Sequence, residues 1–509
     1  MVGLGDLAGG VFSSRATGVS ADGSVVVGFG TVVQNNQSAF RWTQGGSMVD
    51  LGALILGGLS GATGVSADGN VVVGYSSNGN NGAIEAFRWQ NGVMTGLGDL
   101  AGGTYSRANA VSADGNVVVG RADNATSDQA FRWTQAGGIV TVVDWLTAAG
   151  VSTAAWTVLE IANATNTDGS VVVGVGTSTN GTEAFIARAD SSVTGIVGLT
   201  DLSNSLASQL APHVQLESLN YLTLNGAHHK PLTDIAMSDG QSCGWVSGDV
   251  GRTNTDANGW YGLAEVGGCH DFADKALRAG LGIGHSQSSL DYDNNGHSRL
   301  KGEYVLAELD WTIANSSLTA SVLGMAGRWN ADIRRGYSAG TATSTGETDL
   351  NSASLRARLD WKDAFTLGAI NFTPNLQYTV TRTRVDGYQE TGGTAPARFD
   401  SQRHTAQESR LGLTGAYEVS DATTLYGHTE WAHRFDSDAA SVSGNANVLN
   451  VVALPFNIKG NDIRQDWVRV GAEVVHSVNE RNRLSVSGNV ASAGQDADLS
   501  MGVSWNLLF

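Results

Sequence analysis

The chain has 509 residues, of which 41% are hydrophobic and 15% charged, with 67 glycines and only 5 prolines. This composition supplies enough apolar material for two or three ordered domains and excludes a disordered chain. A formal net charge of −18 disfavours a nucleic-acid or anionic-lipid partner, because both require clustered lysine and arginine. No run of about 18 apolar residues occurs, so a helical membrane span is excluded as well.

A repeated unit of about 46 residues fills residues 1–198. Aligned on an Asp-Gly pair, the four copies place Gly18, Gly64, Ala110 and Ala164 in register, at steps of 46, 46 and 54 residues. Each copy contains four short β-branched or aromatic runs separated by glycine-containing turn signals. Four strands per unit is typical of a propeller blade. The pattern therefore predicts a β-propeller-like array of about four blades.

The Asp-Gly pairs fit the first hairpin turn of each blade, because a tight two-residue turn needs positive φ values that glycine and aspartate tolerate. The aspartates could instead be calcium ligands, but no cluster of alternating aspartates accompanies them. We therefore interpret them as turn residues. The positions are Asp22, Gly23, Asp68, Gly69, Asp114, Gly115, Asp168 and Gly169.

An aromatic motif marks the third run of each copy. It reads AFRW at 39–42, 86–89 and 130–133, and is degraded to AFIA at 184–187. One aromatic pair per copy at a constant phase predicts an inter-blade core rather than a ligand-stacking stripe. With these motifs the repeats resemble the HAF family of extracellular repeats, which implies a secreted or surface-displayed module. The histidine of that family is replaced in the four copies by Ser38, Glu85, Gln129 and Glu183.

Residues 199–240 are predicted to form a linker that contains a helix. Leucines recur at helical spacing with serine, asparagine and glutamine between them. These leucines are Leu199, Leu202, Leu206 and Leu210. Pro212 is expected to end or kink the helix. His228 and His229 follow in the linker, but adjacent histidines point apart on most backbones, so we predict no metal site there.

From residue 241 to residue 509 the hydrophobic period is two. In SASLRARLDW at 352–361, apolar residues alternate with polar and charged ones. Soluble sandwiches seldom place two arginines and an aspartate on one face of a long strand, whereas the strands of a membrane barrel face lipid on one side and the lumen on the other. The residues predicted to face the lumen are Arg356, Arg358, Asp360, His428 and Glu430.

About twelve such strands are predicted, an even number as in bacterial single-chain barrels, and barrel closure pairs every backbone group inside a bilayer. The expected fold class is all-β, with the blade array followed by a short helix and a 12-stranded transmembrane β-barrel. The strands lie near 243–250, 258–268, 276–288, 300–313, 316–329, 351–362, 366–384, 404–418, 422–435, 464–477, 481–490 and 498–509. Eight tryptophans near strand ends are predicted to form interfacial girdles, namely Trp245, Trp260, Trp311, Trp329, Trp361, Trp431, Trp467 and Trp505.

This half resembles the autotransporter translocator of Gram-negative outer membranes. The resemblance rests on the CGWVSGDVGR opening at 243–252, the upstream helix, the number of strands and the terminal aromatic residue. It implies that the helix at 199–211 lies in the lumen and tethers a passenger outside. It also implies that the barrel-assembly machinery reads Val503, Trp505, Leu507 and Phe509. Members that cut themselves do so at an Asn-Asn pair in this helix, and SNS stands at 203–205 here, so self-cleavage is not expected.

Two further features concern the ends of these domains. Cys243 and Cys269 lie nearly symmetrically about the first predicted hairpin, which is compatible with a cross-strand disulfide or with two free thiols.

The N-terminus lacks the basic and apolar regions of an export signal. Its VGLGDL run matches the last strand of a repeat unit, which predicts further repeats and a signal upstream of Met1.

The predicted function is that of an autotransporter anchored in the bacterial outer membrane, whose passenger acts in adhesion or recognition of an unidentified extracellular ligand. Outer-membrane lipid and the barrel-assembly machinery are the other expected partners. No histidine or cysteine precedes His213, which removes Ser-His-Asp, Cys-His and histidine-based metal sites from the repeats, and no cofactor is expected. Two alternatives remain, a carboxylate-based glycosidase and a plain outer-membrane channel.

Overall fold

The computed structural model describes residues 3–79, 82–189, 195–226, 240–253, 258–272, 276–292, 295–337, 343–460, 462–492 and 494–509. His228 and His229, like Met1, lie outside the described residues. The chain folds as two compact units, one with the repeats up to Asn204 and one with most of the remaining residues. In the described part of the chain, no helix is long and apolar enough to cross a membrane.

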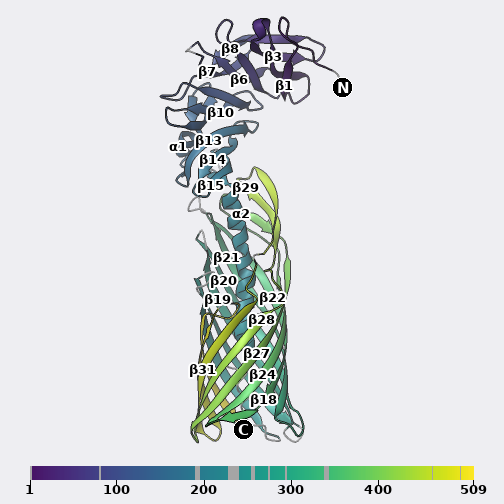
Figure 1. Ribbon diagram of the computed structural model, residues 1–509, viewed down its shortest axis with the longest axis vertical. Helices are drawn as coiled ribbons and strands as arrows, with labels where there is room; N and C mark the ends of the chain where they lie inside the picture. The colour runs from purple at the N-terminus through teal and green to yellow at the C-terminus, as the bar shows by residue number, and fades with distance from the viewer. Residues whose placement is uncertain are drawn as a thin grey trace. The chain divides into compact units, whose positions relative to one another are not determined.

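The repeat region consists of four antiparallel four-stranded sheets, each with its strands in consecutive order (Figure 1). Each sheet is one repeat, as the four runs per copy predict. The strands are β1 (Ser14–Val19), β2 (Val25–Thr31), β3 (Gln37–Thr43) and β4 (Met48–Gly52); β5 (Ser60–Val65), β6 (Val71–Ser77), β7 (Ile84–Gln90) and β8 (Val93–Gly96); β9 (Ser106–Val111), β10 (Val117–Asp123), β11 (Asp128–Thr134) and β12 (Gly138–Thr141); β13 (Trp156–Thr165), β14 (Val171–Ser178), β15 (Gly181–Arg188) and β16 (Gly195–Gly198). A 3-10 turn, η1 (Val33–Asn35), joins β2 to β3.

Consecutive sheets, which we call blades, pack against each other through the first strand of the later one. Strand β5 packs on β1, β2 and β3, and β9 and β13 repeat this arrangement on the blades before them. The core lies in these joints. Between the first two blades, Val27, Val72 and Phe87 are fully buried and Trp89 packs on the same cluster. The aromatic motif therefore contributes to the inter-blade core, as its constant phase predicts.

The longer third step of the repeat has a local cause. The run IVTVVDWL, which matches the closing strand of other copies, divides into β12 and a short helix, α1 (Val142–Ala148). Thr141 caps this helix, since its hydroxyl oxygen accepts the Asp144 N–H at 2.9 Å. Val142 and Leu146 are buried in the joint with the fourth blade. The helix thus adds apolar surface to the same interface.

The second unit contains a closed 12-stranded antiparallel barrel, which confirms the predicted fold class. The first barrel strand pairs with the last, from Cys243 opposite Leu508 to Arg252 opposite Leu499. Every predicted strand overlaps one of those observed. In chain order these are β17 (Ser242–Thr253), β18 (Asn258–Phe272), β19 (Leu277–Tyr292), β20 (Gly296–Thr312), β21 (Leu318–Gly336), β22 (Thr343–Trp361), β24 (Ile370–Val385), β27 (Gln402–Ser420), β28 (Thr423–Arg434), β31 (Asp466–Asn479), β32 (Asn482–Ala491) and β33 (Leu499–Leu508). The short β23 (Phe365–Leu367) pairs with the start of β24.

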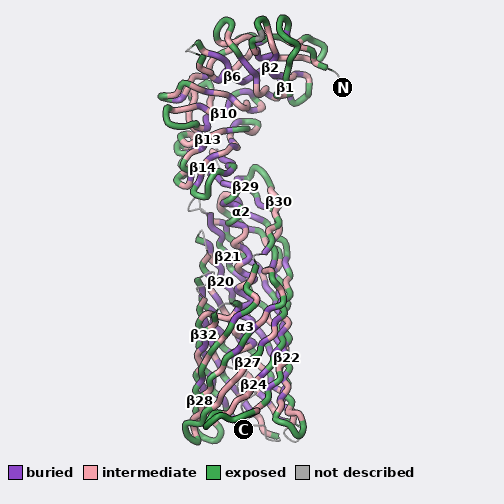
Figure 2. Tube along the Cα trace, in the orientation of Figure 1, coloured by how far each residue is buried: buried purple, intermediate pink, exposed green. Residues whose placement is uncertain are grey.

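The period of two in the sequence is the alternation between the two faces of the barrel wall. Exposed and buried positions alternate along its strands (Figure 2). In β33, Met501 and Trp505 are exposed on the outer face, whereas Ser504 and Asn506 are buried inside. An apolar outer face and a polar inner one are what a bilayer requires of a barrel strand.

Two long connections of the barrel form a small sheet of their own at one end. Its strands are β25 (Tyr388–Gln389), β26 (Ala397–Phe399), β29 (Val442–Val448) and β30 (Val452–Ile458). Phe399 is buried in this sheet and stacks on Tyr388, with 4.8 Å between ring centroids. The opposite end of the barrel carries short connections, such as Asp421–Ala422 between β27 and β28, and the C-terminus.

The predicted helix exists but extends beyond the expected range. It comprises α2 (Leu199–Ala207), a 3-10 turn, η2 (Ser208–Leu210), and α3 (Ala211–Leu224). The expectation that Pro212 ends the helix is wrong. Pro212 occupies the first turn of α3, where a backbone N–H has no partner within the helix and its loss costs nothing. The irregularity lies one turn earlier, at η2.

Candidate functional site

The lumen of the barrel holds α3, and one side of this helix packs in an apolar core. Leu216 and Leu219 are fully buried and belong to a cluster with Trp245, Tyr304 and Trp329 of the barrel wall. The wall strands concerned are the early ones, since α3 packs on β18, β19, β20 and β22. The helix is therefore a packed element of the barrel interior.

Three tryptophans contradict the prediction of interfacial girdles. Trp245, Trp329 and Trp467 point into the barrel and are no more than 2% exposed. Their indole N–H groups donate at 2.7, 2.8 and 2.8 Å to acceptors inside the barrel, which are Glu265, Ser286 and Asp496. A strand-end tryptophan can thus face inwards where the lumen supplies an acceptor and an apolar surface. The remaining five are exposed on the outer face, namely Trp260, Trp311, Trp361, Trp431 and Trp505.

The other side of α3 is held by buried charges. Glu217 pairs through Oε2 with Arg434 Nη1 at 2.8 Å and through Oε1 with His404 Nδ1 at 2.7 Å. Arg434, which is 1% exposed, also pairs with Asp436 at 2.6 Å. Buried charges are tolerated only when paired in this way. The network attaches the middle of α3 to β27 and β28.

Both ends of the helical segment are also anchored by arginines of the wall. At the long-loop end, Arg335 Nη1 donates to Ser205 Oγ at 2.8 Å and pairs with Glu390 at 2.6 Å. At the other end, Arg356 Nη1 donates to the Leu224 carbonyl. A cation at the helix C-terminus satisfies an orphan carbonyl and complements the helix dipole.

Beyond the end of α3 the lumen widens into a polar chamber of about 530 Å³. Four of the residues predicted to face the lumen line this chamber, namely Arg358, Asp360, His428 and Glu430. The fifth, Arg356, lies beside the helix end and is fully buried. Arg358 and Asp360 form an ion pair at 2.7 Å. The chamber is thus lined by both signs of charge.

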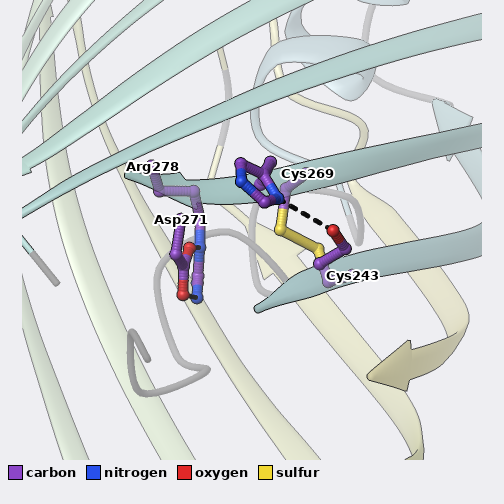
Figure 3. The surroundings of a disulfide bond; sticks show 6 residues. Cys243, Cys269, Asp271 and Arg278 are labelled. Carbon is purple, nitrogen blue, oxygen red and sulfur yellow. Dashed lines mark hydrogen bonds and ion pairs between the residues drawn. A yellow bond between two sulfur atoms is a disulfide. The ribbon is translucent and has the colours of Figure 1, made fainter. Parts of the chain in front are cut away.

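The two cysteines face each other across the first hairpin of the barrel (Figure 3). Cys243 of β17 and Cys269 of β18 are directly opposite in register and are joined by a disulfide. Nearby, Asp271 and Arg278 form an ion pair at 2.6 Å, with both side chains 1% exposed. The disulfide lies at the seam of the barrel, because Cys243 is also opposite Leu508 of the last strand.

The final strand presents its apolar residues outwards. Val503, Trp505, Leu507 and Phe509 are between 41% and 68% exposed on the outer face. The Phe509 N–H donates to the Ser242 carbonyl at 3.0 Å, and the Ser242 N–H donates to the Phe509 carbonyl at 2.9 Å. The C-terminal residue is thereby fixed to the first barrel strand.

In the repeats, the Asp-Gly residues form the first hairpin turn of each blade. Asp22 Oδ1 accepts the Ser20 hydroxyl at 2.7 Å and the Ser24 N–H at 3.0 Å. The Ser20 hydroxyl, followed by the Ser24 N–H, lowers the pKa of Asp22 to about 2. Gly23 has a φ of +73°, which explains the glycine. Among the described residues, no group of three or more histidine, cysteine or acidic side chains could hold a metal ion.

One set of functional positions in the repeats escaped the sequence analysis. Arg41, Arg88 and Arg132 of the AFRW motif each donate through Nε to the turn glycine carbonyl of the next blade, at 3.0, 3.2 and 3.1 Å. The sequence contains a pattern that could have indicated this contact, because the arginine recurs in three copies and is replaced by Ile186 in the last one.

The family of the barrel follows from comparison with known proteins. Residues 243–491 match the family model of the autotransporter beta-domain. The C-terminal half of this chain is an autotransporter β-domain. This domain places the protein in the bacterial outer membrane and assigns its barrel to protein secretion.

Individual relatives match parts of the chain. An uncharacterized protein in the trpE-trpG intergenic region of Pseudomonas putida is 28% identical over 236 residues, which is 45% of this chain and 37% of that protein. An extracellular serine protease of Serratia marcescens is 26% identical over 156 residues, 30% of this chain and 14% of that protein. The chain thus spans well under two thirds of these curated relatives. The translocator domain of the autotransporter NalP from Neisseria meningitidis aligns with a TM-score of 0.45 and 13% identity, covering 61% of this chain and 100% of that domain.

Proposed function

We propose that the barrel displays residues 1–198 at the cell surface as a passenger that acts in recognition or adhesion. The observation that carries this proposal is the position of the helical segment. Ser205, near its start, donates to the Gly336 carbonyl at the long-loop end of the barrel, and Leu224 at its end lies deep in the lumen. In bacterial barrels the long loops are extracellular and the short turns periplasmic. The chain preceding Ser205 therefore leaves the lumen on the extracellular side.

The passenger is proposed to bind rather than to catalyse. A Ser-His-Asp triad like that of serine proteases needs a histidine, and residues 1–198 contain none. Two of the three glutamates in the repeats have structural partners. Glu85 accepts the Gly98 N–H at 2.9 Å, and Glu183 accepts the Ser178 hydroxyl and the Thr200 N–H at 2.5 and 2.8 Å. With 14 acidic and 7 basic residues, the HAF-type repeats have a net charge of about −7, which suits a cationic ligand.

The last strand is proposed to be read by the barrel-assembly machinery. The exposed row of Val503, Trp505, Leu507 and Phe509 supports this, because an assembly factor needs access to the side chains that it reads. Outer-membrane lipid then covers the same face after insertion.

Protease shaving of intact cells tests the display of the passenger. The full chain is expressed behind a supplied export signal, and both halves are blotted after protease treatment. We expect residues 1–198 to be degraded while a fragment containing residues 241–509 survives and migrates differently after heating. Cells with a permeabilised outer membrane serve as the control for access to the periplasm. Repeats that are degraded only in the permeabilised cells would contradict surface display and indicate a periplasmic domain.

A further inference from the structure

The joints between blades repeat one set of contacts. At each joint, the motif arginine of one blade binds the turn glycine carbonyl of the next, as described for Arg41, Arg88 and Arg132. The first strand adds a second bond. Thr17 Oγ1 donates to the Ala62 carbonyl and Thr63 Oγ1 to the Ala108 carbonyl, both at 2.8 Å. These two kinds of bond therefore run in one direction, with donor side chains on the earlier blade and carbonyl acceptors on the later one.

The acceptor side of each joint also fits closely around its turn. The Ala21 N–H donates to the Ala67 carbonyl at 3.0 Å, and the Ala67 N–H donates to the Ala113 carbonyl at 3.0 Å. A Cβ atom on Gly69 would overlap the side chain of Val25 in the preceding blade. The turn glycine is thus needed for its close approach to a valine as well as for its φ of +74°.

The first blade carries the same acceptor side without a partner. Ala16 is exposed, although its equivalents Ala62, Ala108 and Ala162 are fully buried. A Cβ atom on Gly23 would meet nothing within 4 Å. Within the described residues, the inter-blade bonds accepted by Ala62, Ala67 and Gly69 have no counterpart at Ala16, Ala21 and Gly23. The acceptor surface that packs on a preceding blade in the second, third and fourth blades is therefore uncovered on the first blade.

The segment that leads into the first blade shows how this side continues. Residues 3–10 read GLGDLAGG, which is identical to residues 96–103. The latter begin at the last residue of β8, the final strand of the second blade, and lead towards β9. The bond from Ser106 Oγ to the Gly98 carbonyl, 2.7 Å, recurs as one from Ser14 Oγ to the Gly5 carbonyl, 2.8 Å. Residues 3–10 thus have the sequence and contacts of the exit from a preceding blade.

We propose that the open side of the first blade is a docking surface for a further blade of the same repeat type, joined through residues 3–10. The motif arginine of that blade donates to the Gly23 carbonyl, a first-strand hydroxyl or amide donates to the Ala16 carbonyl, and a valine packs on Gly23. A second copy of this chain does not offer these groups at its free end, because Ile186 replaces the arginine in the fourth blade. The proposal does not depend on the secretion function.

The test adds the missing blade to the full chain. A copy of residues 59–95 is fused ahead of Gly3, so that the junction reproduces the native Thr95–Gly96 sequence. Val19→Cys is the reporter, because Val19 is 59% exposed and its equivalent Val65 packs in the joint before it. The two native cysteines form a disulfide, so the reporter is the only free thiol among the described residues. The purified protein in detergent is labelled with a maleimide.

We expect the copy to slow labelling by roughly three-fold or more, because the equivalent Val65 is half-buried in its joint and a thiol there is shielded until the joint opens. The matched control carries Arg88→Gln in the copy alone and should lose most of this protection. Equal labelling with and without the copy would overturn the proposal. Digestion of the added blade by trypsin would also contradict the proposal, because docking on the first blade is expected to bury the core of the added blade. Full protection by the Arg88→Gln copy would refute the role of the arginine.

Discussion

The buried pair between Glu217 and Arg434 provides the sharpest test of the role of the lumenal helix. Glu217→Gln preserves the size of the side chain but removes its charge, which leaves the cation of Arg434 with Asp436 as its partner. Because Glu217 and Arg434 are 4% and 1% exposed, water cannot replace the lost carboxylate. We expect the substitution to favour states in which α3 leaves the lumen.

The expected size of this effect follows from the burial. Removing one member of a buried ion pair costs about 3–5 kcal/mol, and the remaining Asp436 contact favours the lower end of that range. A cost of about 3 kcal/mol changes the equilibrium between the seated and displaced helix by roughly 100-fold. Single-channel recording in planar bilayers measures this, because a displaced helix opens the lumen to ions. The open fraction of the full chain should rise by about that factor.

Two variants complete the test of the pair. Adding Arg434→Met to Glu217→Gln also removes the cation that has lost Glu217 and should return most of the closed state. Glu303→Gln on the exposed outer face is the matched control and should conduct like the wild type. If Glu217→Gln conducts no more than the control, or if the double variant is more open than the single one, the buried pair does not hold the helix. A large conductance in the wild type would instead favour a plain channel.

Three further predictions concern the turns and the disulfide. The added methyl group of Gly69→Ala would overlap Val25, and residue 69 has a φ of +74°, so this substitution should lower the free energy of unfolding of the repeats in urea by about 3 kcal/mol. Gly23→Ala has open space around it and should cost about 1 kcal/mol. Equal losses would contradict the joint geometry. Because folding lowers the pKa of Asp22 from 3.8 to about 2, its stabilisation of the turn is present above pH 3.8 and lost as the pH falls towards 2, which an NMR titration of that carboxyl measures. Thiol titration of the unreduced, unfolded protein should find no free cysteine, and reduction should destabilise the barrel by about 3 kcal/mol; two titratable thiols would exclude the bond between Cys243 and Cys269.

Periodicity in the sequence was sufficient to predict the strands of both halves. The spacing of 46 residues arises because every copy must bury residues in a joint with the next. The period of two arises because every barrel strand alternates between lipid and lumen. Where a local insertion broke the repeat, as at α1, the spacing indicated a longer step but not its cause. The helix was detected from its leucine stripe up to Leu210, but α3 continues without that stripe because barrel wall surrounds it on all sides.

The inward tryptophans and the buried ion pairs were beyond the reach of the sequence, because they depend on what lies across the lumen. Trp245 and Trp361 both stand near strand ends, yet one packs against α3 and the other faces outwards. Likewise, nothing in the local sequence links Glu217 to His404 and Arg434, which are separated from it by 187 and 217 positions. Only the closed barrel brings these charges together.

The two halves of the chain therefore differ in whether their sheets have free edges or faces. The barrel pairs β17 with β33, so its wall has no free edge in the membrane. The blades form a row with two chemically different ends. At the last blade the arginine has become Ile186, which is 8% exposed, and β16 is buried along its whole length. At the first blade the acceptor carbonyls and Ala16 are open. Because a repeat array derives its stability from its joints, a blade with one joint is weaker than a blade with two. Unfolding of the repeats should consequently begin at the first blade, and an added blade should move that starting point by one repeat towards the new end.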